Sequence, residues 1–169
     1  MKMFKAFVLC GFSTLLLLSC SRENSSQSSI LKVRMTDAPA DWDQVNVDLR
    51  EVKVNFSDDS TGWVSLQTHS GIYDLLTLQN GVDTLIAQGT VPAGMVKEIR
   101  FVLGSNNSIM VNGQTYPLTI PSGETSGLKI KIHKNIRAGL DSLLIDFDAA
   151  MSVKEENGSY KLRPVIQLK

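Results

Sequence analysis

The sequence has 169 residues, with 17 Lys and Arg against 17 Asp and Glu, so its formal net charge is zero. At roughly 100–200 residues per domain, this length accommodates one domain with one hydrophobic core. Hydrophobic residues make up 43% of the chain and charged residues 20%, a composition that excludes a disordered protein, and the even charge balance argues against a nucleic-acid binder.

The N-terminal segment has the pattern of a bacterial lipoprotein leader. Two lysines in the first five residues precede an uncharged, mostly apolar run over 6–18, which is the order of regions in a secretory signal peptide. The sequence Leu17-Leu18-Ser19-Cys20 then resembles a lipobox, in which a signal peptidase cuts before a lipid-modified cysteine. The resemblance implies a signal peptide over 1–19 and a lipid on Cys20 that anchors the protein in the bacterial cell envelope. We expect the outer membrane, and whether the domain faces the periplasm or the cell surface stays open.

A polar segment separates the lipidated cysteine from the first hydrophobic strand. Residues 21–29 contain no apolar side chain and bury too little surface to offset the entropy of ordering them. We therefore expect a flexible tether over 20–29 that reaches ~30 Å at most. The only other cysteine, Cys10, lies in the leader, so the domain over 30–169 must fold without a disulfide.

Alternation of apolar and polar residues predicts an all-β domain. Apolar residues recur at every second position in several runs, which are 31–35, 45–49, 52–56, 99–103, 128–132, 143–147 and 162–168. This period places alternate side chains on one face of a strand. Between Leu49 and Val52 the apolar positions change from odd to even numbers, which predicts one long strand with a bulge at Arg50-Glu51. The short strands and their spacing indicate a single antiparallel β-sandwich.

Turn and helix signals are brief. Asn112-Gly113 between two apolar runs predicts a two-residue hairpin turn. Helical spacing extends over only a turn or two, at 82–87 and at 149–153. We therefore expect at most one or two short helical turns.

A series of short motifs runs along the whole domain. They are Thr36-Asp37-Ala38-Pro39-Ala40, Val45-Asn46-Val47, Val52, Trp63, Tyr73-Asp74-Leu75-Leu76, Asn80-Gly81-Val82, Val91-Pro92-Ala93-Gly94, Ile99-Arg100, Pro121-Ser122-Gly123, Ser126-Gly127-Leu128-Lys129, Asp146-Phe147-Asp148-Ala149 and Leu162-Arg163-Pro164-Val165-Ile166. In these residues the chain resembles domain-of-unknown-function family 4382, found in secreted or lipid-anchored proteins of bacteria, notably Bacteroidota, and of archaea. The resemblance implies an immunoglobulin-like or transthyretin-like β-sandwich and no established activity.

Two groups of aspartates form the first candidate site. Asp37, Asp41 and Asp43 lie at the end of the first strand, and Asp146 and Asp148 lie on a late strand. Calcium binds six to eight oxygen ligands, so these five residues would form a calcium site if the two segments are neighbours. The other interpretation is structural. Asp37 and Asp41 suit turns, where carboxylates accept hydrogen bonds from backbone amides, and Asp146 and Asp148 would lie on the solvent face of their strand.

Trp42 is the centre of a second candidate site, for carbohydrate. It lies between Asp41 and Asp43 in a predicted loop, where its ring would stack on a sugar face while these carboxylates and that of Asp37 accept hydrogen bonds from hydroxyls. The alternative is that Trp42 folds back as a lid over the end of the sandwich.

A basic stripe alternates with apolar residues on one late strand. It consists of Lys129, Lys131 and His133, and it would meet an anionic glycan or a lipid headgroup. Lysines also protect the edge of a sheet against pairing with other chains, and this is the role that we expect.

The sequence indicates a binding protein rather than an enzyme. It has no Gly-x-Ser-x-Gly motif, no phosphate-binding loop, no dinucleotide fingerprint, and only two histidines, without the spacing of a zinc site. We therefore expect a lipid-anchored, non-catalytic binding domain with carbohydrate as its ligand. The alternative is a structural or assembly protein whose strands pair with another envelope protein. The expected partners are accordingly the membrane and either a glycan or another envelope protein.

Overall fold

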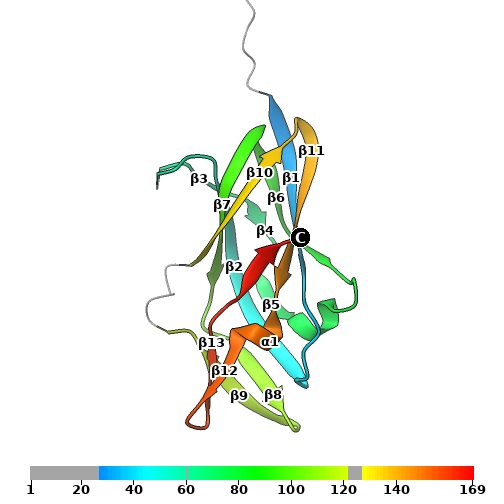
Figure 1. Ribbon diagram of the computed structural model, residues 1–169, viewed down its shortest axis with the longest axis vertical. Helices are drawn as coiled ribbons and strands as arrows, with labels where there is room; N and C mark the ends of the chain where they lie inside the picture. Colours follow the sequence, from blue (N-terminus) through cyan, green and yellow to red (C-terminus); the bar gives the residue numbers. More distant parts are fainter. Residues whose placement is uncertain (1–26, 60, 122–126) are drawn as a thin grey trace, which may run out of the picture.

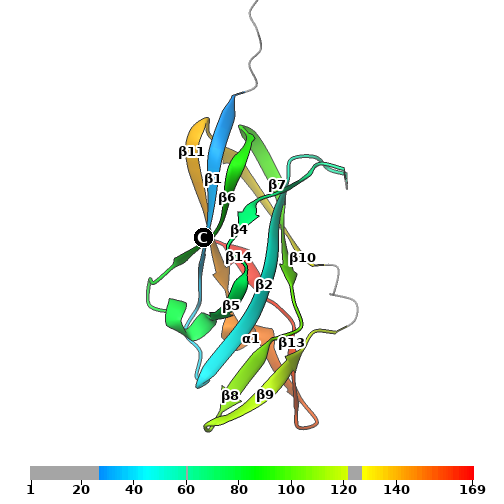
Figure 2. The ribbon, with the colours of Figure 1, turned by 180° about the vertical axis from the view of Figure 1, so that it is seen from behind.

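The computed structural model describes residues 27–59, 61–121 and 127–169, and these form two packed β-sheets (Figures 1 and 2). The predicted signal peptide, Cys20 and most of the predicted tether lie outside the described residues. In the described part of the chain, no helix has the length and apolar character needed to cross a membrane.

The first sheet has five strands with β1 at its centre. The strand order is β14 (Ile166–Leu168), β11 (Gly139–Phe147), β1 (Ser28–Thr36), β6 (Thr84–Pro92) and β4 (Gln67–Thr68). β1 runs antiparallel to β6 but parallel to β11, with Ser29 opposite Gly139 and Thr36 opposite Asp146.

The second sheet has nine strands and is built around β2. Its main order is β10 (Leu128–Ile136), β7 (Gly94–Leu103), β2 (Gln44–Asn55), β8 (Ser108–Val111), β9 (Gln114–Thr119), β13 (Ser159–Leu162) and β12 (Val153–Glu156), while β3 (Trp63–Ser65) and β5 (Gly71–Asp74) pair with β2 outside this order. The predicted all-β sandwich is confirmed. It is not purely antiparallel, because β1 and β11 are parallel and so are β9 and β13.

The predicted bulge in β2 is confirmed. Leu49 lies opposite Leu103 and Glu51 lies opposite Val102, so Arg50 is the extra residue. The bulge restores the alternation, since the apolar positions on both sides of it are buried in the same core.

The predicted hairpin turn between β8 and β9 is also confirmed. Asn112 and Gly113 have φ angles of 50° and 74°, the left-handed conformation that a two-residue hairpin turn of type I′ requires. The predicted helical turn near 149–153 is present as α1 (Ala149–Ser152), and one further turn, η1, is a 3-10 helix over Leu75–Leu78.

The helical turn predicted at 82–87 is wrong, because β6 begins at Thr84. Val33 of β1 lies opposite Ala87, but the next residue lies opposite Leu85, which leaves Ile86 as an extra residue in β6. Ile86 and Ala87 are consequently buried one after the other. Two adjacent buried residues in a bulged strand have the same spacing in the sequence as one face of a helical turn.

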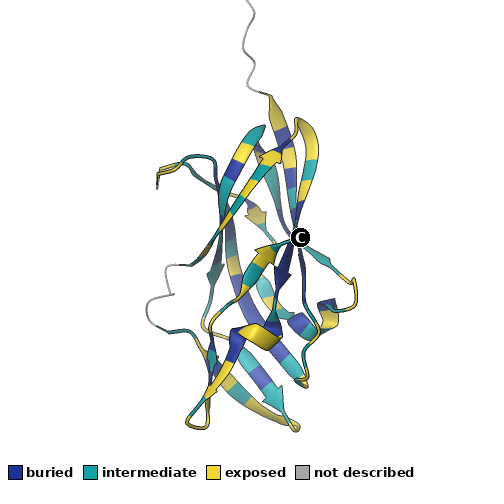
Figure 3. Ribbon diagram, in the orientation of Figure 1, coloured by how far each residue is buried: buried dark blue, intermediate teal, exposed yellow. Residues whose placement is uncertain are grey.

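The core lies between the two sheets (Figure 3). Its largest fully buried side chains come from both layers and are Phe101, Phe147, Leu31, Met35, Leu49, Leu75, Ile86, Ile99, Ile109, Ile136, Leu143 and Ile145. The chain also crosses between the layers after β3, since β3 pairs with β2 and β4 pairs with β6.

Candidate functional site

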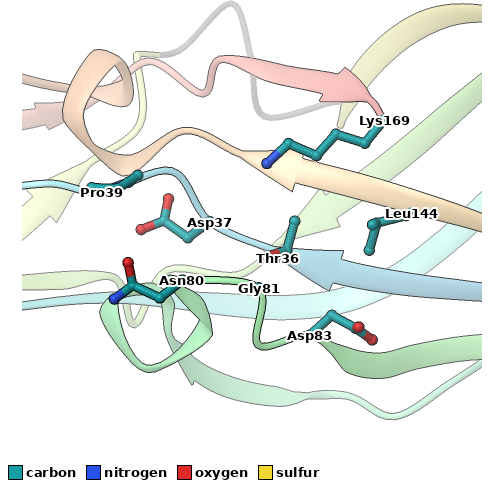
Figure 4. Close-up of a pocket in the computed structure, with 8 residues that line it drawn as sticks. All are labelled: Thr36, Asp37, Pro39, Asn80, Gly81, Asp83, Leu144 and Lys169. Atoms are coloured by element: carbon teal, nitrogen blue, oxygen red, sulfur yellow. The ribbon is translucent and has the colours of Figure 1, made fainter.

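A cleft of about 260 Å³ lies at the end of β1, and both apolar and polar side chains line it (Figure 4). Its walls come from the segment that follows β1, the loop between η1 and β6, and the C-terminal end of β14 beside β11. The lining residues are Thr36, Asp37, Pro39, Asn80, Gly81, Asp83, Leu144 and Lys169. Segments from the beginning, middle and end of the domain therefore meet in this cleft.

Asp37 is a buried carboxylate in the wall of the cleft, with 3% of its surface exposed. Its Oδ1 accepts a hydrogen bond of 2.8 Å from the Ala149 amide, and its Oδ2 accepts one of 3.3 Å from Gln79 Nε2. Burial raises the pKa of Asp37 to about 6; these two hydrogen bonds act in the opposite direction, and the charges of Asp146 and Asp148 add to the rise. Asp37 is therefore harder to ionise than an exposed aspartate.

Asp146 and Lys169 form an ion pair beside Asp37. Asp146 is buried, with 2% of its surface exposed. Its Oδ2 atom lies 3.0 Å from Lys169 Nζ and accepts a hydrogen bond of 3.3 Å from Gln167 Nε2. Its Oδ1 atom is buried and has no hydrogen-bond partner among the described residues. The side chain of Lys169 is about half exposed, so this ammonium group contributes positive charge to the cleft.

The opposite wall is the loop between η1 and β6. Asn80 and Gly81 both have left-handed backbone conformations, with φ angles of 57° and 85°. The side chain of Asp83 forms an ion pair with Arg34 of β1, and the Thr36 hydroxyl donates a hydrogen bond to the loop. Before the turn, the Asp37 amide donates a hydrogen bond of 3.0 Å to the Leu78 carbonyl. The segment at the end of β1 therefore contacts the chain on both sides of the turn.

Three of the five predicted calcium ligands lie close together. The charges of Asp146 and Asp148 both raise the pKa of Asp37, and Asp148 caps α1 by accepting a hydrogen bond of 2.9 Å from the Met151 amide. Asp146 is buried, with Gln167 of the neighbouring strand β14 opposite it, so the prediction that it lies on a solvent face is wrong.

The other two predicted ligands lie at the start of β2. Asp43 accepts a hydrogen bond of 2.9 Å from the Gly113 amide in the β8–β9 turn, and Asp41 is exposed. Within residues 27–59, 61–121 and 127–169, no group of three or more His, Cys, Asp and Glu side chains is arranged to hold a metal ion. The hydrogen bonds of Asp37, Asp43 and Asp148 to backbone amides are those expected of structural aspartates.

Trp42 packs against the end of the core and is half-buried. Its ring packs edge to face against the ring of Tyr160, with ring centroids 6.4 Å apart and an interplanar angle of 81°. The ring centroids of Tyr160 and Tyr116 are 5.1 Å apart. This is the geometry of a lid over the β9–β13 end of the sandwich, and part of the ring surface is occupied by protein.

The basic stripe lies on β10, the outer strand of the nine-stranded sheet as described. Lys129, Lys131 and His133 are exposed, and β10 bulges between Lys131 and Lys134, where His133 has a φ angle of 47°. Lysines and a bulge on an outer strand are features that discourage pairing with other chains.

Sequence reasoning missed most of the cleft. Lys169, Asp83 and Leu144 were not singled out, because their meeting depends on which strands are neighbours in the first sheet. The dipeptide Asn80-Gly81 carries a turn signal, and it is the one sign of the opposite wall that the sequence offered.

Comparison with known families gave one match. The model of a family described as "Domain of unknown function (DUF4382)" matches residues 28–164. The matched segment begins with β1 and ends just before β14, so it includes every residue that lines the cleft except Lys169. Neither the curated proteins nor the solved structures contain a match to the chain.

Proposed function

The chain belongs to the DUF4382 family of domains of unknown function, and we propose that it is a lipid-anchored protein of the bacterial cell envelope that binds a small polar ligand in the cleft beside Asp37. The observation that carries the proposal is a cleft of about 260 Å³ whose lining includes the buried carboxylate of Asp37, the carboxylate of Asp83 and the ammonium group of Lys169. The lipobox at Cys20 supports the anchor, and the outer membrane is the proposed location.

The chemistry of the cleft suits a sugar. Asp83 and Asn80 supply hydrogen-bond acceptors, Asn80 and Lys169 supply donors, and Pro39 supplies apolar surface. A sugar hydroxyl both donates and accepts hydrogen bonds, while the faces of the ring are apolar. The volume of the cleft lies just below the ~300 Å³ at which pockets for drug-sized ligands begin, so a single sugar unit is the proposed ligand. The proposed sugar site therefore lies at the cleft rather than at Trp42.

We propose binding rather than catalysis. A pKa near 6 suits a general acid or base, but both oxygens of Asp37 already accept hydrogen bonds from Ala149 and Gln79. The carboxylate of Asp83 is engaged by Arg34. Neither group is poised to exchange a proton with a ligand, so the geometry supports recognition.

The alternative, assembly through strand pairing, has less support. Three outer strands of the described sheets are very short, namely β4, β12 and β14, and the long outer strand β10 carries lysines and a bulge. A strand of this kind is a poor template for an added strand.

The experiment is a titration of the mature protein with a panel of monosaccharides, followed by calorimetry. Asn80→Gly removes an amide from the cleft and keeps the left-handed turn, and Asn157→Gly makes the same change in the β12–β13 turn, where Asn157 has a φ angle of 51°. We expect a sugar to bind and Asn80→Gly to weaken it at least fivefold, with Asn157→Gly unchanged. If no sugar binds, or if both variants bind like the original protein, the proposed site is wrong.

Membrane anchoring is tested separately by mass spectrometry of the purified protein and by cell fractionation. We expect an acylated Cys20 at the N-terminus of the mature chain and loss of the membrane-bound fraction in Cys20→Ser. An unmodified cysteine would overturn the anchor and leave the ligand site to be judged by the titration.

A further inference from the structure

One end of the sandwich is the place where the chain enters the fold. The first residues of β1 lie there beside the β6–β7 turn, and the Ala93 amide donates a hydrogen bond of 2.7 Å to the Gln27 carbonyl. Figures 1 and 2 both show the β10–β11 turn at this same end, and the β8–β9 hairpin at the opposite end. We call this end, formed by residues 27–30, 91–95 and 136–141, the tether tip.

The tether tip exposes large apolar side chains. Ile30 is 49% exposed, Leu140 is 63% exposed and Met95 is 44% exposed. Ile30 and Leu140 lie opposite one another on β1 and β11, and neighbouring strands are ~4.8 Å apart, so the two side chains form one continuous apolar patch. Met95 lies on β7 in the other sheet. Both layers of the sandwich therefore present apolar surface at the same end.

Charged groups accompany these apolar residues. Lys134 and Arg137 lie close enough to Asp141 for their charges to favour its ionised form, and Asp141 accepts a hydrogen bond of 2.9 Å from the Arg137 amide. Arg137 in the tether tip and Lys134, two residues before the 136–141 segment of the tip, thus face one carboxylate. Apolar side chains flanked by a surplus of basic groups are typical of surfaces that meet the headgroup region of a bilayer.

The length of chain before β1 places this surface near the membrane. β1 begins at Ser28, so residues 21–27 separate Cys20 from the fold. Seven residues span at most ~25 Å even when fully extended. An acyl chain on Cys20 would therefore hold the tether tip, and not the β8–β9 end, close to the bilayer.

From these observations we infer that the tether tip rests on the membrane, with Ile30, Leu140 and Met95 inserted among the lipid headgroups. The inference rests on the anchoring part of the proposed function. It goes beyond that function by giving the domain a fixed orientation, in which the lipid holds the protein on the bilayer and the apolar tip docks against it.

A single-thiol experiment tests this orientation. Cys10 lies in the leader and Cys20 would carry the lipid, so Leu140→Cys introduces the one reactive thiol of the mature protein. Thr115→Cys in the β8–β9 hairpin, also exposed, is the matched control. Each thiol is labelled with bimane, and the acylated protein is reconstituted in phosphatidylethanolamine–phosphatidylglycerol vesicles that contain a nitroxide-labelled lipid.

We expect the bimane at position 140 to shift to shorter wavelength and to be quenched at least twofold more than the bimane at position 115. Met95→Cys is a second tip position, and it should behave like Leu140→Cys. Equal quenching at all three positions would overturn the inference. A bimane at position 140 that is already shielded in detergent without vesicles would overturn it too, in favour of a second copy of the chain as the occupant.

Labelling of the protein without substitutions distinguishes a failure of the lipid anchor from a failure of the docked orientation. If that protein reacts with bimane, Cys20 is free, and the anchor fails together with the docked orientation. If it does not react and the tip positions are quenched no more than position 115, the anchor stands and only the docking is wrong.

Discussion

The carboxylate of Asp37 accepts a hydrogen bond of 2.8 Å from the amide of Ala149, 112 residues further along the chain. This bond joins the segment that follows β1 to the first residue of α1, directly beyond the parallel pair of β1 and β11. The bond is buried, and a hydrogen bond is stronger in such surroundings, so it stabilises the wall of the cleft. The same burial raises the pKa of the Asp37 carboxylate.

The pH dependence of stability should carry the signature of Asp37. Its pKa is about 6 in the folded protein, against an ordinary value of 3.8, so between these pH values the folded state binds more protons than the unfolded state. The free energy of unfolding should therefore fall as pH rises from about 4 to about 6, by up to roughly 3 kcal/mol. Asp37→Asn keeps an oxygen that can accept the Ala149 hydrogen bond, and its stability should be flat over this range in urea titrations at pH 4, 5, 6 and 7.

The lowered pKa of Asp59 acts in a different pH window. Asp59, whose pKa is lowered to about 2 chiefly by a hydrogen bond from the Thr61 side chain, contributes stability that is lost only as pH falls below about 4. A parallel loss of stability in the original protein and in Asp37→Asn between pH 4 and pH 6 would show that Asp37 is not the group responsible.

Replacement of Trp42 should measure its role as a lid. Trp42→Ala removes the edge-to-face contact with Tyr160, and we expect a loss of about 2 kcal/mol in the free energy of unfolding, below the 3–5 kcal/mol typical of a fully buried tryptophan. Trp42→Phe retains an aromatic edge and should cost less than about 1 kcal/mol. Chemical denaturation distinguishes the two, and unchanged stability in Trp42→Ala would contradict the lid.

Gly104 should be intolerant of a side chain. A Cβ atom at this position would collide with Oδ2 of the buried Asp48 and would lie 2.5 Å from Arg50 Nε. Asp48 Oδ2 accepts hydrogen bonds from Arg50 Nη2 at 2.7 Å and from the Asn106 amide at 3.2 Å, so these bonds must rearrange. We expect Gly104→Ala to destabilise the fold by about 1–3 kcal/mol.

Gly71→Ala is the control for that substitution. A Cβ atom at Gly71 meets nothing within 4 Å, so thermal unfolding should show an unchanged or slightly higher melting temperature. If the two glycine variants have equal melting temperatures, the packing at Gly104 is looser than the structure describes.

Calcium should leave the melting temperature unchanged. Asp37, Asp43 and Asp148 are engaged by backbone amides, and Asp146 is engaged by Lys169. We expect thermal melts of the protein in millimolar calcium and in chelator to coincide. A rise with calcium that disappears in Asp146→Asn would instead establish a metal site at the cleft.

The strands and their faces were predictable where local spacing determines them. The change of parity between Leu49 and Val52 located the bulge of β2, and Asn112-Gly113 located a turn. The same logic failed at Ile86, where a second bulge imitates helical spacing. The parallel pairing of β1 with β11 was not predictable, because alternation tells which face of a strand is buried but says nothing of its neighbour or direction.

The cleft was predictable only in part. Asp37 was a candidate because an aspartate before Ala-Pro suits a turn and contributes oxygen ligands. Lys169 and Asp83 carry no local signal, since each acquires its role from a partner far away in the sequence, Asp146 and Arg34 respectively. The partners of the buried Asp146 are Gln167 and Lys169. They reach it because β14 pairs with β11, a pairing that the sequence pattern leaves undetermined.

The parallel pair of β1 and β11 has a consequence for how the chain folds. Ser29 pairs with Gly139 and Thr36 with Asp146. During synthesis, β1 can therefore form this pairing only after more than a hundred further residues have been added to the chain. Contacts of such long sequence separation slow folding toward the millisecond-to-second range. Until β11 arrives, one edge of β1 lacks a partner, and the nascent chain is exposed to aggregation during that interval. The first sheet is therefore complete only after this long-range pairing has formed.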